Sequence, residues 1–182
     1  LAQAWQAARM TASQCRLILR TPSRFDAARL LPKLEEALSA GDVASLELRL
    51  GGMSEAQARA AIDLLRPAAQ RRDVAVLLSG QALLAAETGC DGVHIAPEEM
   101  SYADARALLG PEGIVGFAAG ASRHLAVEAA EAGADFVSFG PYFPEDPVPA
   151  AGLDLLRWWQ EVIEIPCVAM GGIGPENALG VI

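Results

Sequence analysis

PCVAMGGIGPEN, residues 166–177, shows the unit from which the whole chain is built. Its apolar run, 167–170, is typical of a strand buried on both faces, and Gly171-Gly172 allows a tight turn and close approach of the backbone to a ligand. Pro175 and Glu176 suit the first turn of a helix, which we predict from 175 to 182. A strand, a glycine turn and a helix start expose free N–H groups together, as a phosphate site requires. An ordinary strand-to-helix connection explains the same glycines, and this segment alone does not separate the two interpretations.

The same order of strand and helix recurs along the whole chain. Predicted strands occupy 15–20, 44–50, 74–79, 92–96, 114–119, 136–140 and 167–170. Predicted helices occupy 1–10, 25–40, 54–70, 81–88, 101–109, 122–132, 153–163 and 175–182. Ser54, Ser101 and Ser122 are suitable N-caps, and Gly89 is a suitable helix stop. No hairpin signals interrupt this order, so the sequence predicts a parallel sheet with right-handed crossovers.

Two architectures have this order, an open doubly wound sheet and a closed barrel. The strands are short and evenly spaced and no G-x-G-x-x-G follows the first, which favours an α/β fold of the (β/α)₈ TIM-barrel type. We expect residues 1–182 to form a single domain, since the length and a hydrophobic content of 52% support one sizeable core. A barrel is about 250 residues long, so we expect the eighth βα unit to lie outside this sequence.

The charge and hydropathy patterns narrow the class of protein. A net charge of −9 argues against nucleic acid and anionic membrane surfaces as partners, because both attract clusters of Lys and Arg. No apolar run is long enough to span a bilayer and no signal peptide opens the sequence, so we expect a soluble cytoplasmic protein. Lys33 is the only lysine and falls within a predicted helix, which argues against Schiff-base chemistry.

Metal-ligating residue types are few and scattered. Cys15, Cys90 and Cys167 lack metal-type spacing and are expected to be buried thiols in a reducing compartment. His94 and His124 are too few for a histidine-rich zinc site. We expect His124 on a helix face. His94, within an apolar strand, suits either a hydrogen-bonded core histidine or a ligand contact.

In a barrel, the active site lies where strands end and helices begin. That rule selects the segments 47–52, 79–81, 94–99, 118–121, 140–148 and 171–174. Arg49 is an arginine at a strand end and needs an anionic partner, which is either a phosphate or the carboxylate of Glu47 or Glu99. Tyr142 and Phe143 either roof a pocket for a flat heterocycle or close their loop.

Three segments, in this order and spacing, resemble the family of thiamine phosphate synthases and TenI proteins. They are CDGVHIAPEEM (90–100), EAGADFVSFGPYFP (131–144) and VAMGGIGPENA (168–178), and the resemblance covers nearly the whole chain from Cys15 onward. It implies a (β/α)₈ barrel of thiamine biosynthesis, a transferase that joins a pyrimidine diphosphate to a thiazole phosphate and releases pyrophosphate with the help of Mg²⁺. It also implies a cytoplasmic homodimer that binds a small phosphorylated heterocycle and neither nucleic acid nor membrane.

The resemblance assigns roles to residues at several strand ends. Arg49 and His94 are the catalytic candidates, and Glu99 is the candidate Mg²⁺ ligand. The candidates for substrate binding are Glu47, Ser79, Gln81, Gly140, Gly171 and Gly172. The last two of these are expected to form a cradle for the monophosphate.

Several positions depart from the family pattern. The second-strand motif Q-L-R, followed closely by Lys, reads Glu47-Leu48-Arg49-Leu50-Gly51, and the N-D-R after the third strand reads Ser79-Gly80-Gln81. Ala118 replaces the fifth-strand serine, and acidic and apolar residues within 145–148 replace the phosphate-binding Thr and Lys of the sixth-strand loop. These losses remove groups that assist a leaving diphosphate. We therefore expect a synthase-like protein whose diphosphate and Mg²⁺ site is degraded. One alternative is a catalytically inactive relative that binds a phosphorylated heterocycle. The other is a different phosphate-recognising barrel enzyme.

Overall fold

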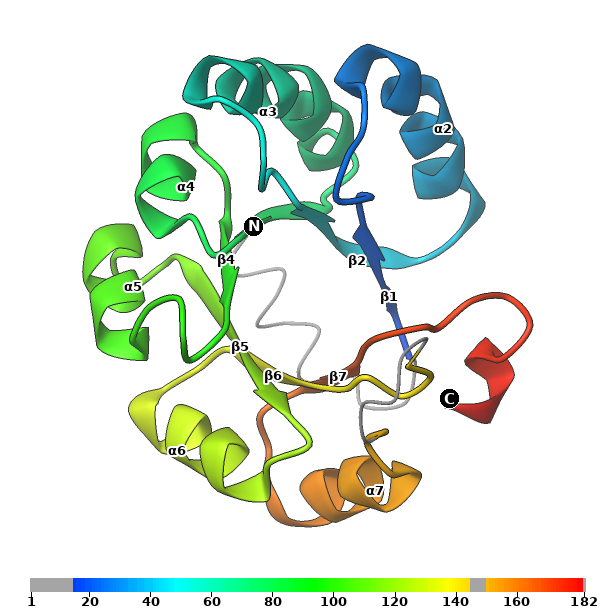
Figure 1. Cartoon of the computed structure of the whole chain (residues 1–182), viewed down its shortest axis with the longest axis vertical. Coiled ribbons are helices and arrows are strands. Elements are labelled where there is room, and N and C mark those ends of the chain that lie inside the picture. The colour runs from blue at the N-terminus through cyan, green and yellow to red at the C-terminus, as the bar shows by residue number, and fades with distance from the viewer. Residues whose placement is uncertain (1–14, 145–149, 182) are drawn as a thin grey trace. The chain divides into compact units, whose positions relative to one another are not determined.

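The computed structural model describes residues 15–144 and 150–181, in which strands and helices alternate (Figure 1). The strands are β1 (Leu17–Arg20), β2 (Val43–Leu48), β3 (Ala75–Ser79), β4 (Gly92–Ile95), β5 (Ile114–Gly120), β6 (Phe136–Phe139) and β7 (Cys167–Ala169). The helices are α2 (Ala27–Ala40), α3 (Glu55–Gln70), α4 (Ala82–Thr88), α5 (Tyr102–Leu109), α6 (Arg123–Ala132), α7 (Leu153–Val162) and the 3₁₀ helix η1 (Ala178–Gly180). The predicted helix 1–10 and the loop 145–148 lie outside the described residues.

The chain divides into two compact units. The described residues of unit 1 are 15–94 and 105–114, and those of unit 2 are 95–104 and 115–181 apart from 145–149. Strand order follows chain order in both, from β1 to β4 in unit 1 and from β5 to β7 in unit 2. The parallel βα repeat is the TIM-barrel-like α/β fold that the sequence predicts. Folding of 1–182 as one domain stays a prediction.

Local capping signals place the helix ends where the sequence predicts them. The Ser54 hydroxyl accepts the N–H of Gln57 at 3.4 Å, and the Ser122 hydroxyl accepts the N–H of Leu125 at 3.2 Å. Gly89 ends α4 with a φ of 68°, a left-handed conformation that costs glycine little. These bonds satisfy backbone groups that have no partner within the helix itself.

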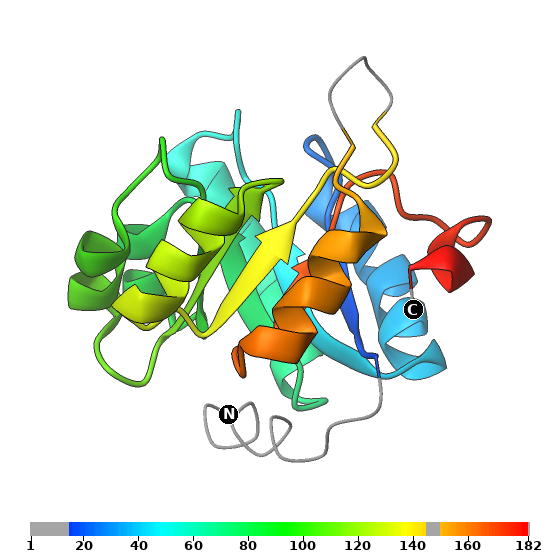
Figure 2. The same ribbon diagram turned by 90° about the horizontal axis from the view of Figure 1, so that it is seen from below.

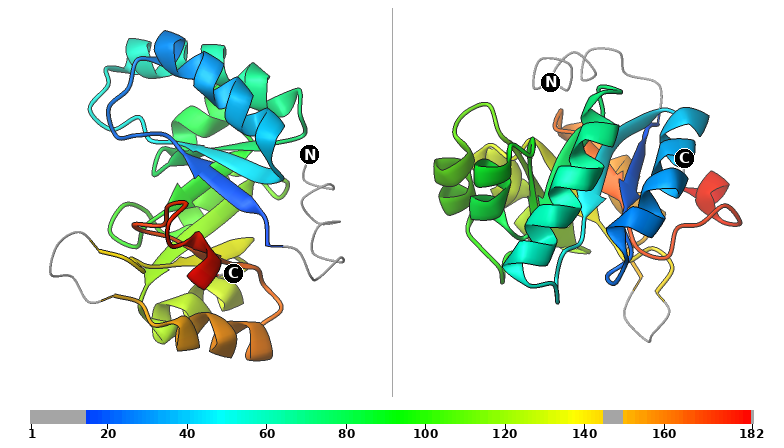
Figure 3. Two further views of the ribbon diagram at one scale, coloured as in Figure 1. Left: turned by 90° about the vertical axis from the view of Figure 1, so that its right-hand side faces the viewer. Right: turned by 90° about the horizontal axis from the view of Figure 1, so that it is seen from above.

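In unit 1, β2 is buried on both faces, as expected for a parallel strand with neighbours on each side. Because side chains alternate along a strand, Leu46 and Leu48 share one face, and Ser45 and Glu47 share the other. All four are at most 1% exposed. Helix α3 packs on β2 and β3 and lies beside α2, as Figure 3 shows. The polar face of β2 is the face that carries the candidate site.

In unit 2, glycine creates space for an aromatic side chain. Gly116 of β5 lies opposite Phe136 of β6, and a Cβ on Gly116 would collide with the Phe136 ring. Helices α6 and α7 pack against β6 and β7 respectively (Figure 2). Trp159 of α7 is fully buried, and its indole N–H donates to the carbonyl oxygen of Ile165 at 2.6 Å. Trp159 therefore fixes α7 beside the start of β7.

Two expectations for the stretch 166–182 are wrong. β7 is half-buried rather than buried on both faces, and β6 is the strand paired with it among the described residues. A turn and the short η1 replace the α-helix predicted from Pro175. Asn177 explains the turn, because its side-chain oxygen accepts the N–H of Gly174 and its amide donates to the carbonyl of Gly172, both at 2.8 Å. Such local side-chain bonds compete with helix formation.

The three cysteines are more exposed than the sequence predicts. The expectation of buried thiols is wrong, since Cys15 is exposed and Cys90 and Cys167 are half-buried. Cys15 precedes β1, and Cys167 starts the half-buried β7, so neither lies in a strand enclosed on both faces.

Among the described residues, no helix is both long and apolar enough to cross a membrane.

Candidate functional site

The predicted site residues lie at the carboxyl ends of strands and form one group in each unit. The group in unit 1 consists of Glu47, Arg49, Ser79, Gln81 and His94. The group in unit 2 consists of Glu99, Gly140, Gly171 and Gly172.

Glu47 is the centre of a buried ionic network in unit 1, which we call the Arg20-Glu47-His94 network. Nη2 and Nε of Arg20 each lie 2.9 Å from one carboxylate oxygen of Glu47, a bidentate pairing. Nδ1 of His94 lies 3.3 Å from Oε2 of the same carboxylate. The side chain of Glu47 is 1% exposed, that of His94 is 6% exposed and that of Arg20 is 37% exposed. The network thus extends from the interior of unit 1 to its surface.

The pKa of Glu47 reflects two opposing influences. Burial alone would raise it, but the hydrogen bond and charge interaction with His94, together with Arg20, lower it below its ordinary value. Glu47 is therefore a carboxylate at neutral pH. The position of His94 matches a hydrogen-bonded core histidine, and its predicted catalytic role stays a prediction.

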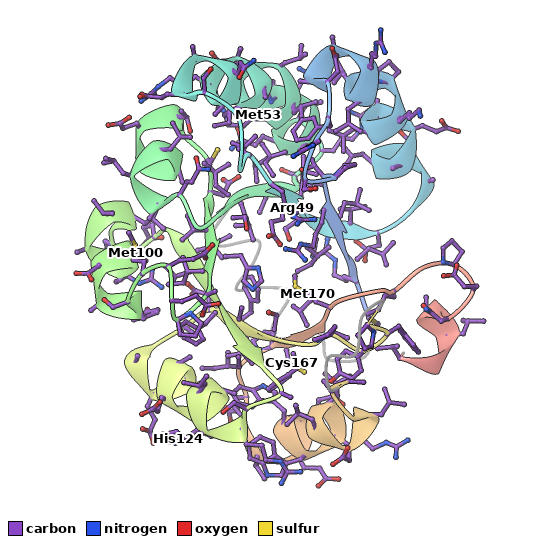
Figure 4. The ribbon with its side chains drawn as sticks, viewed as in Figure 1. Arg49, Met53, Met100, His124, Cys167 and Met170 are labelled. Carbon is purple, nitrogen blue, oxygen red and sulfur yellow. The ribbon has the colours of Figure 1, made fainter. Side chains whose placement is uncertain are left out.

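Arg49 follows β2 directly and its side chain is exposed (Figure 4). Its backbone N–H donates to Oγ1 of Thr21 at 2.9 Å, and the N–H of Thr21 donates to the carbonyl oxygen of Glu47 at 3.0 Å. Of the two alternatives for Arg49, an ion pair is not observed: no carboxylate pairs with Arg49 among the described residues, and Glu47 is held by Arg20 and His94 instead. The Arg49 guanidinium therefore remains available to an anion.

Ser79 and Gln81 flank the end of β3. Ser79 lies opposite His94 in the β3–β4 register and is half-buried, while Gln81 precedes α4 without a side-chain capping bond. The N–H of Gly80, between them, donates to the carbonyl oxygen of His94 at 3.0 Å. Both predicted side chains thus lie at the same strand ends as the Arg20-Glu47-His94 network.

Glu99 is the candidate metal ligand in unit 2. It is exposed, and its Oε2 accepts the backbone N–H of Ala96 at 2.8 Å, so one carboxylate oxygen already stabilises a turn. Among the described residues, no group of three or more His, Cys, Asp or Glu side chains could hold a metal ion. Since Mg²⁺ is often bound by one or two carboxylates together with waters and substrate phosphates, Glu99 would be a single protein ligand to it.

The strand ends of β6 and β7 carry glycines that the packing of the backbone requires. A Cβ on Gly171, whose φ is 90°, would lie 2.6 Å from Cα of Pro141. A Cβ on Gly172, whose φ is 68°, would collide with the carbonyl oxygen of Phe143, and one on Gly140 would collide with that of Met170. The glycines at 171 and 172 therefore serve the close approach of two loops of the same unit.

The same turn presents free donors. Within the described residues, the N–H groups of Gly171, Gly172 and Ile173 donate to no other residue, and the latter two residues are exposed. Successive N–H groups in a turn form a concavity suited to an anion. Both interpretations of the glycine turn, close packing and an anion cradle, are therefore compatible with this geometry.

Tyr142 and Phe143 differ in their surroundings. Tyr142 is 6% exposed and its N–H donates to the carbonyl oxygen of Met170 at 3.0 Å, so it helps to close the loop onto β7. Burial, with smaller effects of Cys167 and Asp154, raises the pKa of Tyr142 to about 12. Phe143 is 40% exposed, so its ring is the one accessible from outside.

Sequence reasoning missed Arg20. A charged residue at the carboxyl end of a predicted strand is the signal that selected Arg49, and Arg20 ends the strand predicted at 15–20 in the same way. The first strand carried no family motif, so its end was not among the segments selected.

Known proteins share both sequence and structure with this chain. A sequence model of the family described as thiamine monophosphate synthase matches residues 17–182. The thiamine-phosphate synthase of Rhodospirillum centenum is 47% identical over 169 residues, which cover 91% of this chain and 82% of the relative. That of Hyphomonas neptunium is 46% identical over 172 residues, 90% of this chain and 77% of the relative. The solved thiamine phosphate pyrophosphorylase of Pyrococcus furiosus superposes with a TM-score of 0.78 at 29% identity, covering 91% of this chain and 79% of that one.

These similarities and the strand order define a TIM-barrel-like α/β protein. The chain belongs to the thiamine monophosphate synthase family and so to the proteins of thiamine biosynthesis. The family and the fold predicted from the sequence are confirmed.

Proposed function

We propose that this chain catalyses the thiamine-phosphate synthase reaction, joining a pyrimidine diphosphate to a thiazole phosphate and releasing pyrophosphate. The identity of 47% to a thiamine-phosphate synthase, over 82% of that relative, supports the assignment. The observation that carries it is the state of Arg49. Its guanidinium is exposed at a strand end and pairs with no described carboxylate, because Arg20 and His94 engage Glu47.

Arg49 is assigned to the diphosphate. A guanidinium binds two oxygens of a phosphate at once, and a leaving diphosphate gains negative charge as it departs. A cation fixed beside that charge stabilises the transition state more than the bound substrate. Ser79 and Gln81, at the end of β3, supply neutral hydrogen-bonding groups to the diphosphate, and His94 acts on it through Glu47.

The monophosphate of the thiazole is assigned to the turn Gly171–Ile173. Its N–H groups, which have no acceptor among the described residues, support an anion site there. Gly140 supports this cradle by allowing the end of β6 to approach the carbonyl of Met170. No step of this proposal is assigned to Mg²⁺, and Glu99 stays its candidate ligand. The homodimer implied by the resemblance stays a prediction.

A second candidate function is that of a relative which binds the thiazole phosphate without synthase chemistry. The observation in its favour is the loss of family side chains at Gly51, Gly80, Gln81 and Ala118, which leaves fewer groups to assist the leaving diphosphate. This candidate keeps the glycine turn and loses the leaving-group assistance.

The test is pyrophosphate release by the full chain with both substrates and Mg²⁺ in the buffer. We expect turnover by the wild type and a loss of about 100-fold in kcat/KM in Arg49→Met, because one charge-stabilising donor is removed. Arg71→Met is the matched control, an exposed arginine that follows α3 and precedes β3, with an expected change of less than about twofold. Absence of turnover, with thiazole phosphate still raising the melting temperature, would overturn the proposal in favour of the second candidate.

A further inference from the structure

Only one edge of the Arg20 guanidinium is hydrogen-bonded to Glu47. Its Nε–H and one Nη2–H face the two carboxylate oxygens of Glu47, each at 2.9 Å. A guanidinium carries five N–H donors in a planar fork, so both Nη1–H groups and the second Nη2–H remain. Among the described residues, none of these three donors has a partner. The side chain is 37% exposed, so its free edge is accessible.

The backbone places Arg20 and Arg49 at the ends of neighbouring strands. Arg20 ends β1 and lies opposite Glu47 in the β1–β2 register. Thr21 then bonds twice to the neighbouring strand, through its N–H to the carbonyl of Glu47 and through Oγ1 to the N–H of Arg49. The two arginines therefore leave adjacent strands at the same end of unit 1.

Glu47 fixes the guanidinium rather than contacting a ligand itself. Its side chain is 1% exposed, and both of its oxygens are engaged by Arg20, with His94 on one of them. A bidentate pair holds the arginine in one orientation, so little conformational entropy remains to be lost on binding. Among Arg20, Arg49 and Glu47 the formal charges sum to +1, in a chain whose net charge is −9.

We propose that Arg20 is a second substrate-binding residue of this site, whose free guanidinium edge binds phosphoryl oxygens of the diphosphate substrate, and that Glu47 is the residue that positions it. The inference rests on the proposed function and adds to it a residue that no family motif supplies. It also replaces the predicted direct role of Glu47 in substrate binding with an indirect one. A guanidinium from β1 thereby compensates in part for the lysine that Gly51 replaces.

The chain contains a matched pair for comparison. Arg16 and Asp42 lie at the opposite, amino-terminal end of β1 and β2, where Nε and Nη2 of Arg16 each lie 2.9 Å from Oδ1 of Asp42. The Arg16 side chain is 33% exposed, close to the value for Arg20. The two arginines thus lie at the two ends of β1 with similar exposure and a carboxylate partner each, and they differ in the exposure of that partner, 58% for Asp42 and 1% for Glu47.

The first experiment measures binding of inorganic pyrophosphate to the full chain by calorimetry. We expect the wild type to bind, Arg20→Met to bind about tenfold more weakly or worse, and Arg16→Met to stay within about twofold of the wild type. Binding by folded Arg20→Met that equals that of the wild type would overturn the inference, as would an absence of binding by the wild type.

Arg20→Lys keeps the inference testable if Arg20→Met does not fold. Lysine keeps the charge and loses the planar fork, so we expect KM for the pyrimidine diphosphate to rise about tenfold. KM for the thiazole phosphate should stay within about twofold, because a merely structural defect would move both constants. Equal changes in the two constants would overturn the inference.

The inference and the proposed function fail in different ways. Pyrophosphate binding that depends on Arg20, in a chain that releases no pyrophosphate from the two substrates, would overturn the synthase proposal and support the anion site at Arg20. Turnover that is unchanged in Arg20→Lys and Arg20→Met would support the synthase proposal and overturn the role of Arg20.

Discussion

In unit 1, the strand ends carry charged side chains that pair with one another. In unit 2, the strand ends are followed by glycine turns whose backbones pack closely together. The Arg20-Glu47-His94 network joins β1, β2 and β4 through side-chain bonds. At the ends of β6 and β7, Gly140, Gly171 and Gly172 face backbone or proline atoms that would collide with, or crowd, a Cβ. The carboxyl ends of the strands thus carry paired charged side chains in unit 1 and closely packed glycines in unit 2.

The difference teaches which perturbation each group of site residues tolerates. Charged side chains respond to pH and to the loss of a partner, because a buried carboxylate without its cation is costly. A glycine turn has no titrating group, but any added side chain forces the backbone to move. The following predictions are ordered from the largest expected effect to the smallest.

Gly172→Ala should be the most damaging single substitution. The new Cβ would meet the carbonyl oxygen of Phe143 at a φ of 68°, and we expect a loss of about 2–4 kcal/mol in the free energy of unfolding. Gly180→Ala is the control, since no atom lies within 4 Å of its Cβ position. Denaturant unfolding measures both variants. A loss in Gly172→Ala no larger than that in Gly180→Ala would contradict the claim that backbone packing defines this turn.

Arg20→Met should destabilise unit 1 more than Arg16→Met does. Removal of Arg20 leaves the 1% exposed Glu47 with His94 as its remaining partner in the network. We expect a loss of about 2 kcal/mol, below the range for fully buried pairs because the Arg20 side chain is 37% exposed. Arg16→Met should cost at most about 1 kcal/mol, as for surface pairs. Equal losses, measured by denaturant unfolding, would mean that burial of Glu47 does not set the strength of the network.

Acid should weaken the network of unit 1 and leave the glycine turn of unit 2 unaffected. The folded pKa of Glu47 lies below its ordinary value of 4.5, so folding favours the ionised form. That stability is fully present above the ordinary value and is lost as the pH falls through the lower folded value. In urea unfolding from neutral pH downward, the stability difference between wild type and Glu47→Gln should therefore shrink in acid.

The difference between wild type and Gly172→Ala serves as the control for this titration. No titratable group contributes to the collision at Gly172, so that difference should stay constant over the same range. A wild-type advantage over Glu47→Gln that persists unchanged in acid would show that the charge of Glu47 contributes nothing to stability.

Gly51→Lys should have the smallest effect on stability and should strengthen anion binding. No atom lies within 4 Å of the Cβ position of Gly51, so we expect a stability change within about 0.5 kcal/mol. The added cation should tighten pyrophosphate binding by about threefold to tenfold. Gly52→Lys is the control, because Gly52 has a φ of 87° and a lysine there would be strained. Calorimetry that finds no gain in Gly51→Lys would place the diphosphate away from the end of β2.

Much of the fold was predictable because its signals are local. The capping serines Ser54 and Ser122 and the stop at Gly89 act over a few residues, and the structure places the helix ends beside them. The helix predicted from Pro175 failed for an equally local reason, since Asn177 bonds to the turn before it. The burial of β7 was not predictable, because it depends on strands that lie beside it rather than on its own apolar run.

The candidate site was predictable only in its location. Strand ends selected Glu47, Arg49 and His94 from sequence, but their partners depend on register. Arg20 meets Glu47 from 27 residues away, and His94 meets it from 47 residues away. The choice between a phosphate and Glu47 as the partner of Arg49 could not be made from the sequence for that reason.

The sequence by itself determined the βα repeat, the family and the strand ends that carry polar residues. Periodicity, capping residues and short motifs act within one element or one turn, and each can be recognised without knowing its neighbours. Only the tertiary structure decided which side chain neutralises Glu47, which arginine keeps a free edge and which glycines are forced by packing. Those outcomes depend on the parallel register that brings β1 beside β2, and on the approach of the β6 and β7 loops, which bring together residues distant in the chain.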